Sequence, residues 1–308
     1  MLIIIEISVK REWAVQGGRE MNIFYGIVLI AAVLWGTTGT AQMFLQGEIS
    51  AVSVAMIRSG IGGGILLLAV ILLRKIQFKQ WSWKWTFLAA LAIGLFQVLF
   101  FSSIRYTGVA VGTVVTIGSS PVFAGVIEWV LWRVKPTKVW AIATCSAIVG
   151  CALLFLVGGE TVVDPFGVML ALMAGFMFAL YTNVSKRLME QEEPLPAVAM
   201  TFSICALLLL PFAWSDGFQW VIAGMNGLTM LYLGIFSTSI AYILFLSGLQ
   251  KISSSSAVTL SLAEPLTAAL LGVFFLDEQL SPVSWIGVAF ILMGIIVLTF
   301  GARKDLTA

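Results

Sequence analysis

Ten stretches of apolar residues, separated by short polar segments, follow one another along the chain. Each is long enough to cross the roughly 30 Å hydrocarbon core of a bilayer as a helix. The runs are continuous, as at Leu207–Leu210, and lack the period-two alternation of β-barrel strands. The pattern therefore predicts ten transmembrane helices, over residues 23–43, 51–73, 86–104, 109–131, 138–157, 166–185, 197–214, 227–248, 254–275 and 283–300.

The composition supports a membrane protein. Apolar residues make up 60% of the 308 positions and charged residues only 10%, and the mean hydropathy is +1.05. Soluble domains are about 45–50% apolar and about 25% charged. Soluble globular and disordered classes are thereby excluded, and a net charge of +2 is too small to indicate a nucleic-acid partner. The expected surroundings are the lipid bilayer.

The basic residues predict how the chain is oriented. Positive loops face the cytoplasm in membrane proteins. With both termini inside, cytoplasmic segments receive 15 of the 17 basic residues. The exceptions are Arg105, in an outer loop, and Arg58, within the second span. We therefore expect a multi-pass protein of the plasma (inner) membrane with cytoplasmic N- and C-termini.

The second half of the sequence resembles the first. A shift of 144 residues places Pro121 over Pro265 and Gly150 over Gly294. A shift of 141 places Gly26 over Gly167. Because five spans are an odd number, the second half enters the membrane from the opposite side, which gives the inverted repeat of many secondary transporters. The expected division is a tail (1–21), a first repeat (22–157), a second repeat (158–300) and a tail (301–308). Whether Met1 or Met21 is the natural start stays open.

Two charged residues lie deep within predicted spans, whereas Glu128 lies near the cytoplasmic end of the fourth span, five residues before Arg133, where local neutralisation is expected. Arg58 lies about 10–12 Å below the outer boundary, and Glu264 lies near the middle of the ninth span, directly before Pro265. Embedded charges are costly and usually face the bundle interior or water. They can bind a solute, or they can neutralise each other as a structural pair.

Other polar and aromatic groups also occur within spans. Pro121 and Pro265 are candidate hinges, because proline removes a helical hydrogen bond. Polar side chains three or four residues apart share one helix face, and they form a stripe in the fourth and in the ninth span: Thr113, Thr116 and Ser120, and Ser261, Glu264 and Thr267. Such stripes more often join helices than bind solutes. Candidate binding residues beside Arg58 and Glu264 are Trp35, Gln97, Ser120, Tyr181 and Tyr242.

No enzymatic constellation is visible in the sequence. The chain has no histidine, which removes the commonest general base and metal ligand. It has no phosphate-binding loop and no cluster with metal-ligand spacing. We therefore expect no cofactor, no metal site and no catalytic residues.

Several local sequences together resemble the drug/metabolite transporter superfamily, specifically its EamA-type members. They are Trp35-Gly36, Arg58 after Ser50-Ala51-Val52-Ser53, Ile104-Arg105-Tyr106-Thr107, Ser120-Pro121, Glu264-Pro265, and Phe274 to Leu280 leading to Gly287 and Gly294. The resemblance implies two five-helix repeats, transport of small metabolites such as amino acids, and a central cavity, with spans 5 and 10 peripheral. One feature departs from the family pattern, in which a glutamate follows the proline of each repeat. Glu278 follows Pro265 in the second half, whereas Val134 stands at the corresponding place after Pro121.

The sequence thus predicts an all-α polytopic membrane protein with ten transmembrane helices in two inverted repeats. The predicted function is that of a secondary carrier, an exporter of amino acids or related compounds, with alternating access around a midplane site. Proton coupling through Glu264, uncoupled export and a homodimer stay open. The alternatives are a membrane-embedded lipid-modifying enzyme and a non-transporting membrane subunit.

Overall fold

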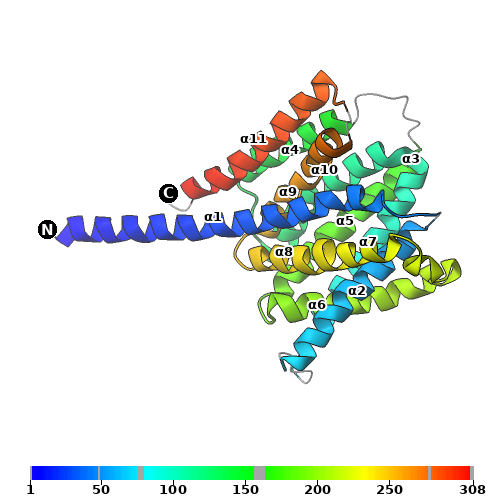
Figure 1. Ribbon diagram of the computed structural model, residues 1–308. Helices are drawn as coiled ribbons and strands as arrows, with labels where there is room; N and C mark the ends of the chain where they lie inside the picture. Colours follow the sequence, from blue (N-terminus) through cyan, green and yellow to red (C-terminus); the bar gives the residue numbers. More distant parts are fainter. Residues whose placement is uncertain (1, 48, 75–79, 156–163, 277–278, 306–308) are drawn as a thin grey trace.

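The chain forms a bundle of helices in the computed structural model, which describes residues 2–47, 49–74, 80–155, 164–276 and 279–305 (Figure 1). The predicted repeat boundary at 157/158 and Glu278 lie outside the described residues. The helices are α1 (Leu2–Gln42), α2 (Ala51–Leu72), α3 (Trp83–Trp132), α4 (Lys138–Phe155), α5 (Pro165–Leu188), α6 (Pro194–Ala213), α7 (Asn226–Tyr232), α8 (Ala241–Leu249), α9 (Ser254–Leu260), α10 (Ala263–Leu276) and α11 (Pro282–Asp305). Two short 3₁₀ turns, Trp214–Asp216 and Gln219–Ile222, precede α7.

The all-α membrane fold predicted from the sequence is confirmed. Within the described residues, nine helical segments are long and apolar enough to cross a membrane, and a shorter apolar helix covers Lys138–Leu154. The segment before the first predicted span is helical as well, because α1 begins at Leu2 and extends beyond the bundle (Figure 1).

Two predicted spans are joined in one helix. α3 contains the crossings Trp83–Gly108 and Val111–Trp132 and turns between them at Gly108, whose φ of 77° and ψ of 165° are not helical. A positive φ is readily available only to glycine. At Pro121 the backbone stays helical, so the predicted hinge there is not where α3 departs from helical geometry.

Two later spans are interrupted. The crossing Asn226–Leu249 contains a π-helical segment at Leu233–Ile240 between α7 and α8. The crossing Ser254–Phe274 breaks after Leu260 and resumes at Ala263, so Pro265 lies in the first turn of α10. Proline is tolerated there because the first amides of a helix have no intrahelical partner.

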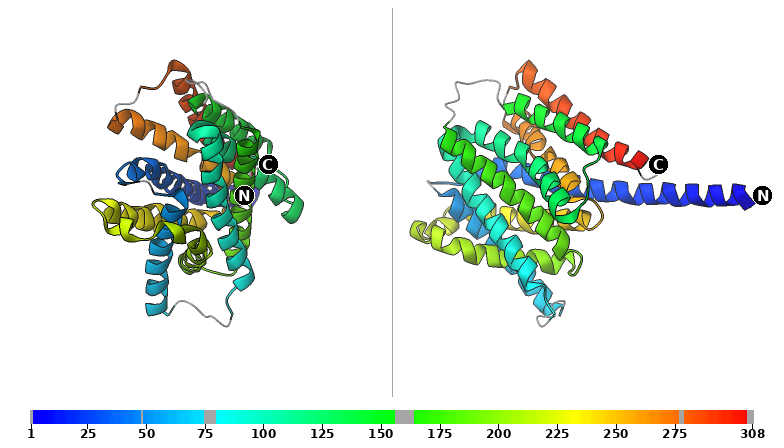
Figure 2. Two further views of the ribbon diagram at one scale, coloured as in Figure 1. Left: turned by 90° about the vertical axis from the view of Figure 1, so that its right-hand side faces the viewer. Right: turned by 180° about the vertical axis from the view of Figure 1, so that it is seen from behind.

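The contacts between α4 and α11 follow the internal repeat of the sequence. A Cβ at Gly150 would lie 2.6 Å from the carbonyl oxygen of Gly287, and a Cβ at Gly294 would lie 2.6 Å from that of Ala143. The 144-residue shift exchanges these two contacts. Small residues allow such close helix contacts in membranes. This pair lies at one side of the bundle, as expected for spans 5 and 10 (Figure 2).

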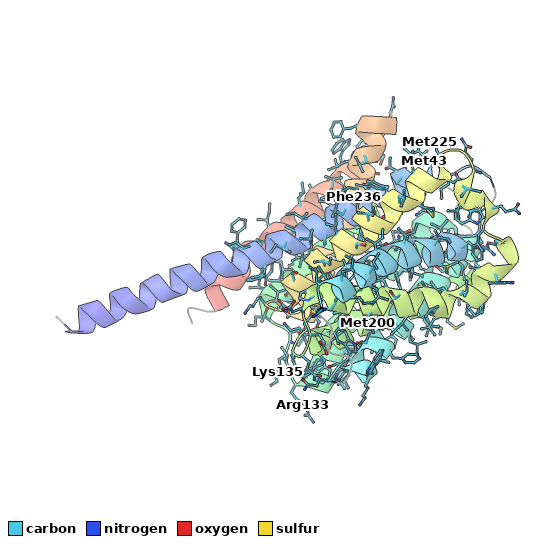
Figure 3. The ribbon with its side chains drawn as sticks, turned by 60° about the horizontal axis from the view of Figure 1, so that its bottom comes forward. Met43, Arg133, Lys135, Met200, Met225 and Phe236 are labelled. Carbon is cyan, nitrogen blue, oxygen red and sulfur yellow. The ribbon has the colours of Figure 1, made fainter. Side chains whose placement is uncertain are left out.

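The two ends of the bundle differ in charge. We call the end where α2 meets α3 and α8 meets α9 the basic end; among described residues it carries Arg74, Lys84, Arg133, Lys186 and Lys251. At the opposite end α1 meets α2. Arg133 and Lys135 lie apart from Met43 and Met225, which are neighbours at that opposite end (Figure 3).

Candidate functional site

A cavity of about 280 Å³ lies between the two halves of the sequence. Its walls come from α1, α2, α3, α5, α8, α10 and the break between α9 and α10. The lining residues are Trp35, Gly36, Thr38, Gly39, Gln42, Arg58, Phe96, Gln97, Phe100, Phe101, Ile104, Thr113, Thr116, Ile117, Ser120, Phe178, Tyr242, Ser261, Glu264, Pro265 and Ala268.

The cavity contains six of the seven binding residues predicted from the sequence. Tyr181 is the exception. It is only 1% exposed and lies behind the cavity wall, with its ring 5.8 Å from that of Tyr242 and 6.3 Å from that of Phe178. Tyr181 follows the cavity-lining Phe178 by three residues on α5, and the rings of Phe178 and Tyr242 fill the space between Tyr181 and the cavity. Of the predicted hinges, Pro265 lines the cavity and Pro121 does not.

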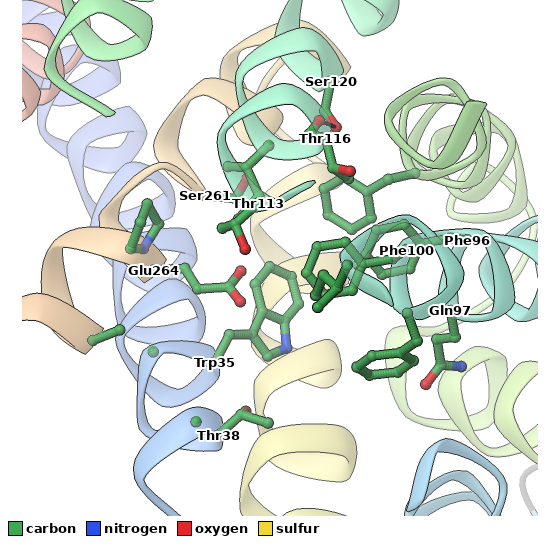
Figure 4. Close-up of a pocket in the computed structure, with 18 of the residues that line it drawn as sticks. Trp35, Thr38, Phe96, Gln97, Phe100, Thr113, Thr116, Ser120, Ser261 and Glu264 are labelled. Atoms are coloured by element: carbon green, nitrogen blue, oxygen red, sulfur yellow. Dashed lines mark hydrogen bonds between the residues drawn. The ribbon is translucent and has the colours of Figure 1, made fainter. Parts of the chain in front are cut away.

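Glu264 owes its position to the helix break. It lies in the first turn of α10, ten residues after Ser254 and so roughly 15 Å along the span, near mid-membrane. The positive end of the α10 dipole favours a carboxylate at this place. The carboxylate points into the cavity beside Thr113 and Ser261, across the Trp35 ring from Phe96 and Gln97 (Figure 4).

The close approach of α1 supports this arrangement. A Cβ at Gly36 would lie 2.7 Å from the backbone oxygen of Glu264 and 2.9 Å from Cγ2 of Thr267. Only glycine permits this packing without displacement of α10. Gly36 thus fixes the broken segment against α1, while the preceding residue, Trp35, faces the cavity.

Arg58 and Glu264 both line the cavity but form no ion pair with each other in the described part of the chain. Nε of Arg58 is buried without a hydrogen-bond partner, as are Nε1 of Trp35 and Oε1 of Gln97. Unsatisfied buried polar groups are costly. Arg58 and Glu264, both described residues, thus do not form a hydrogen-bonded ion pair, and the cavity offers donors at Arg58 and Trp35 and acceptors at Gln97 and Glu264.

An aromatic layer closes one side of the cavity. The Trp35 ring lies 4.8 Å from that of Tyr242 and 6.1 Å, edge to face, from that of Phe178. Phe96 lies 5.2 Å from Phe178 and stacks on Phe100 at 5.7 Å. Such geometries stabilise aromatic pairs. Together they form a wall suited to the apolar part of a ligand.

Several lining residues were missed by sequence reasoning. Phe96, Phe100 and Phe178 were not singled out, because the chain has 21 phenylalanines and nothing in an apolar span distinguishes those that face a cavity. Phe96 and Phe100 do stand four residues apart beside Gln97, so they share a helix face with a polar group. That spacing is the available signal.

The hydroxyl stripes have mixed roles. Thr116 donates to the carbonyl of Ala171 at 3.1 Å and so joins α3 to α5. Ser120 donates to the carbonyl of Thr116 at 2.7 Å, and Ser261 donates to that of Val258 at 2.7 Å. These hydroxyls line the cavity and retain acceptor lone pairs.

The sequence matches the EamA-like transporter family over residues 22–156 and again over residues 165–300. The chain belongs to this family. The two successive matches agree with the repeat seen in the sequence and in the contacts of α4 with α11. The EamA-like chain is thus a multi-pass membrane transporter, and a transporter implies a small-molecule substrate.

Individual proteins resemble this EamA-like chain over nearly their whole length. The uncharacterized transporter YwfM of Bacillus subtilis (strain 168) is 45% identical over 287 residues, which are 93% of this chain and 97% of the relative. The uncharacterized inner membrane transporter YicL of Salmonella typhimurium is 29% identical, over 90% of this chain and 95% of the relative. A crystal structure of a protein with 18% identity superposes with a TM-score of 0.80, over 92% of this chain and 99% of that chain. This last match concerns the fold alone.

Proposed function

We propose that the chain is a secondary carrier that exports a small zwitterionic metabolite, such as an amino acid or a related compound. The observation that carries this proposal is that two opposite charges, Arg58 and Glu264, line one cavity between the two halves without a salt bridge between these two described residues, while Nε of Arg58 has no hydrogen-bond partner. A zwitterion presents a carboxylate and an amine, so it can satisfy both groups at once. Neither an anion nor a cation alone would do so.

Each lining group has a role in this proposal. The Arg58 guanidinium attracts the substrate carboxylate, and the Glu264 carboxylate accepts a hydrogen bond from the amine or takes a proton. Trp35 and Tyr242 form the apolar wall, with Tyr181 supporting it from behind. Gln97 and Ser120 orient polar groups of the substrate. Alternating access then arises from rocking of the inverted halves around the cavity.

The proposed location is the plasma (inner) membrane, with both termini in the cytoplasm. The segregation of basic residues supports this orientation, and one relative is named an inner membrane transporter. In this orientation the basic end faces the cytoplasm. Proton-coupled export through Glu264 and uncoupled downhill export both fit the proposal, as do a monomer and a homodimer.

The test is counterflow in proteoliposomes that contain the purified carrier. Vesicles loaded with unlabelled amino acids should take up a labelled amino acid transiently and saturably. Glu264→Gln and Arg58→Ala should reduce this uptake strongly. The matched controls are Glu190→Gln and Arg105→Ala, because both residues are exposed and lie outside the cavity.

Two results would contradict the proposal. The first is wild-type counterflow in both cavity variants when they are folded, which would remove the site assignment. The second is absence of counterflow across a broad metabolite panel, which would favour a lipid-modifying enzyme or a non-transporting subunit. Counterflow measured with and without a pH gradient separates coupled from uncoupled export.

A further inference from the structure

The α8–α9 connection at the basic end is held by two charged side chains from other helices. Glu128 of α3 is 6% exposed. Its Oε1 accepts a hydrogen bond from the Ser254 amide at 3.0 Å, and its Oε2 accepts from the Ser255 amide at 3.1 Å and the Ser255 hydroxyl at 2.6 Å. The carboxylate therefore caps the first turn of α9.

Lys186 of α5 holds the same connection from the other side. Its Nζ donates to the carbonyl of Leu249 at 2.6 Å and to that of Ile252 at 2.8 Å. Leu249 is the last residue of α8. An anion at the start of α9 and a cation at the end of α8 both match the helix dipoles, and hydrogen bonds to charged groups are stronger than neutral ones.

These contacts lie at the end of the bundle where the cavity is closed. Cavity-lining residues reach the last residue of α1, Gln42, at the opposite end. Toward the basic end the lining stops at Tyr242, seven residues before the end of α8. Beyond it lies a fully packed layer of residues that are at most 1% exposed, which includes Tyr181, Ala124, Ala257, Leu260 and Leu249.

The positions that the internal repeat relates to Glu128 and Lys186 carry no charge. The shift of 144 residues relates Glu128 to Gly272, and the shift of 141 relates Lys186 to Leu45. In an inverted repeat, the contacts that close one end are replaced by their repeat equivalents when the other end closes. Here the equivalent positions carry no charge, so the two closed states differ in energy.

We propose that Glu128 and Lys186 form a latch that closes the basic end and makes the state open at the opposite end the resting state of the carrier. Opening the basic end separates the α8–α9 connection from α3 and α5, and it leaves the Glu128 carboxylate and the Lys186 ammonium without these partners. This inference rests on the proposed alternating access, but not on the identity of the substrate.

The experiment measures access to the packed layer directly. Ala257, which is 0% exposed in α9, is replaced by cysteine, and the purified carrier in lipid nanodiscs reacts with a charged methanethiosulfonate reagent. Peptide mass spectrometry follows each cysteine separately. Glu128→Ala and Lys186→Met should each raise the reaction rate at position 257 by about tenfold or more, because loss of one charge-assisted contact shifts the population by at least that factor.

The controls separate gate opening from damage to the fold. Lys251→Met changes an exposed cation in the same connection and should leave the rate at position 257 unchanged. Native Cys151 is fully buried on α4, away from the latch, and should stay unreactive. An unchanged rate at position 257, or a parallel rise at Cys151, overturns the proposal. Since no substrate is used, failure of the zwitterion assignment leaves this measurement intact, and the reverse also holds.

Discussion

The two repeat-related crossings Val111–Trp132 and Ser254–Phe274 each contain a proline at the equivalent position, but their backbones differ around it. The first is helical through Pro121, whereas the second is broken before Pro265. Each carries one carboxylate where its counterpart has a small residue: Glu264 corresponds to Ser120, and Glu128 corresponds to Gly272. One carboxylate lies in the cavity and the other at the basic end. The scaffold is thus symmetric while its charges are not.

Moving the cavity carboxylate to the other copy should have the largest effect. The double variant Ser120→Glu/Glu264→Ser should lose counterflow by about 100-fold or more, because position 120 lies inside a continuous helix whose amides are already bonded. Proteoliposome counterflow measures this loss, with Glu264→Asp as the partly active reference. Activity near wild type in the double variant would show that the helix break is not what makes position 264 suitable.

Removing the cavity cation should have the next largest effect. The shift of 141 residues relates Arg58 to Ala199, so the second copy offers no replacement. Arg58→Ala should raise the KM for a zwitterionic substrate by about 10- to 100-fold, the loss expected for a hydrogen bond to a charged group. Initial transport rates at several substrate concentrations provide the measurement. An equal effect of Arg105→Ala would assign the loss to general surface charge instead.

Replacing the glycines that pack against the two crossings by alanine should destabilise the protein to a similar extent in both places. Gly36→Ala places a Cβ against the Glu264 carbonyl, and Gly175→Ala places one 2.7 Å from the Thr116 carbonyl. Each should destabilise the protein by about 1–3 kcal/mol, the usual cost of overpacking, as seen in thermal unfolding in detergent. Gly26→Ala is the control, since nothing lies within 4 Å of its added Cβ. Because alanine favours a helix over glycine, the control should not lose stability, and equal destabilisation by the control would contradict crowding as the cause.

The prolines themselves should contribute least. Pro121→Ala allows one more amide bond in a helix that is already continuous, and Pro265→Ala changes a first-turn position that tolerates proline. Both variants should change the free energy of unfolding by less than about 1 kcal/mol. Thermal unfolding measures the change in stability, and a counterflow assay on the same variants measures transport. A large transport loss in Pro121→Ala alone would show that the unbroken crossing bends during the cycle.

Much of the architecture could be predicted from hydropathy because the membrane imposes it. Runs of about 20 apolar residues form helices in the bilayer, because no water is available there to hydrogen-bond the backbone N–H and C=O groups. Arg58, Gln97 and Glu264 were found for the same reason, since polar groups in such runs need an environment other than lipid. For Glu128 the sequence predicts only local neutralisation by Arg133, because its partners in the structure, the amides of Ser254 and Ser255, are more than 100 residues away in sequence.

The sequence by itself determined the helices, their membrane setting, the internal repeat and the family, because each depends on local apolar length or on residue identity. Only the tertiary structure decided which residues face the cavity, that Tyr181 lies behind it, that the chain breaks before Pro265 but not at Pro121, and that the basic end is closed. These features depend on which helix faces meet. In an almost uniformly apolar span the choice of face is set by side-chain packing and helix contacts, which hydropathy does not encode.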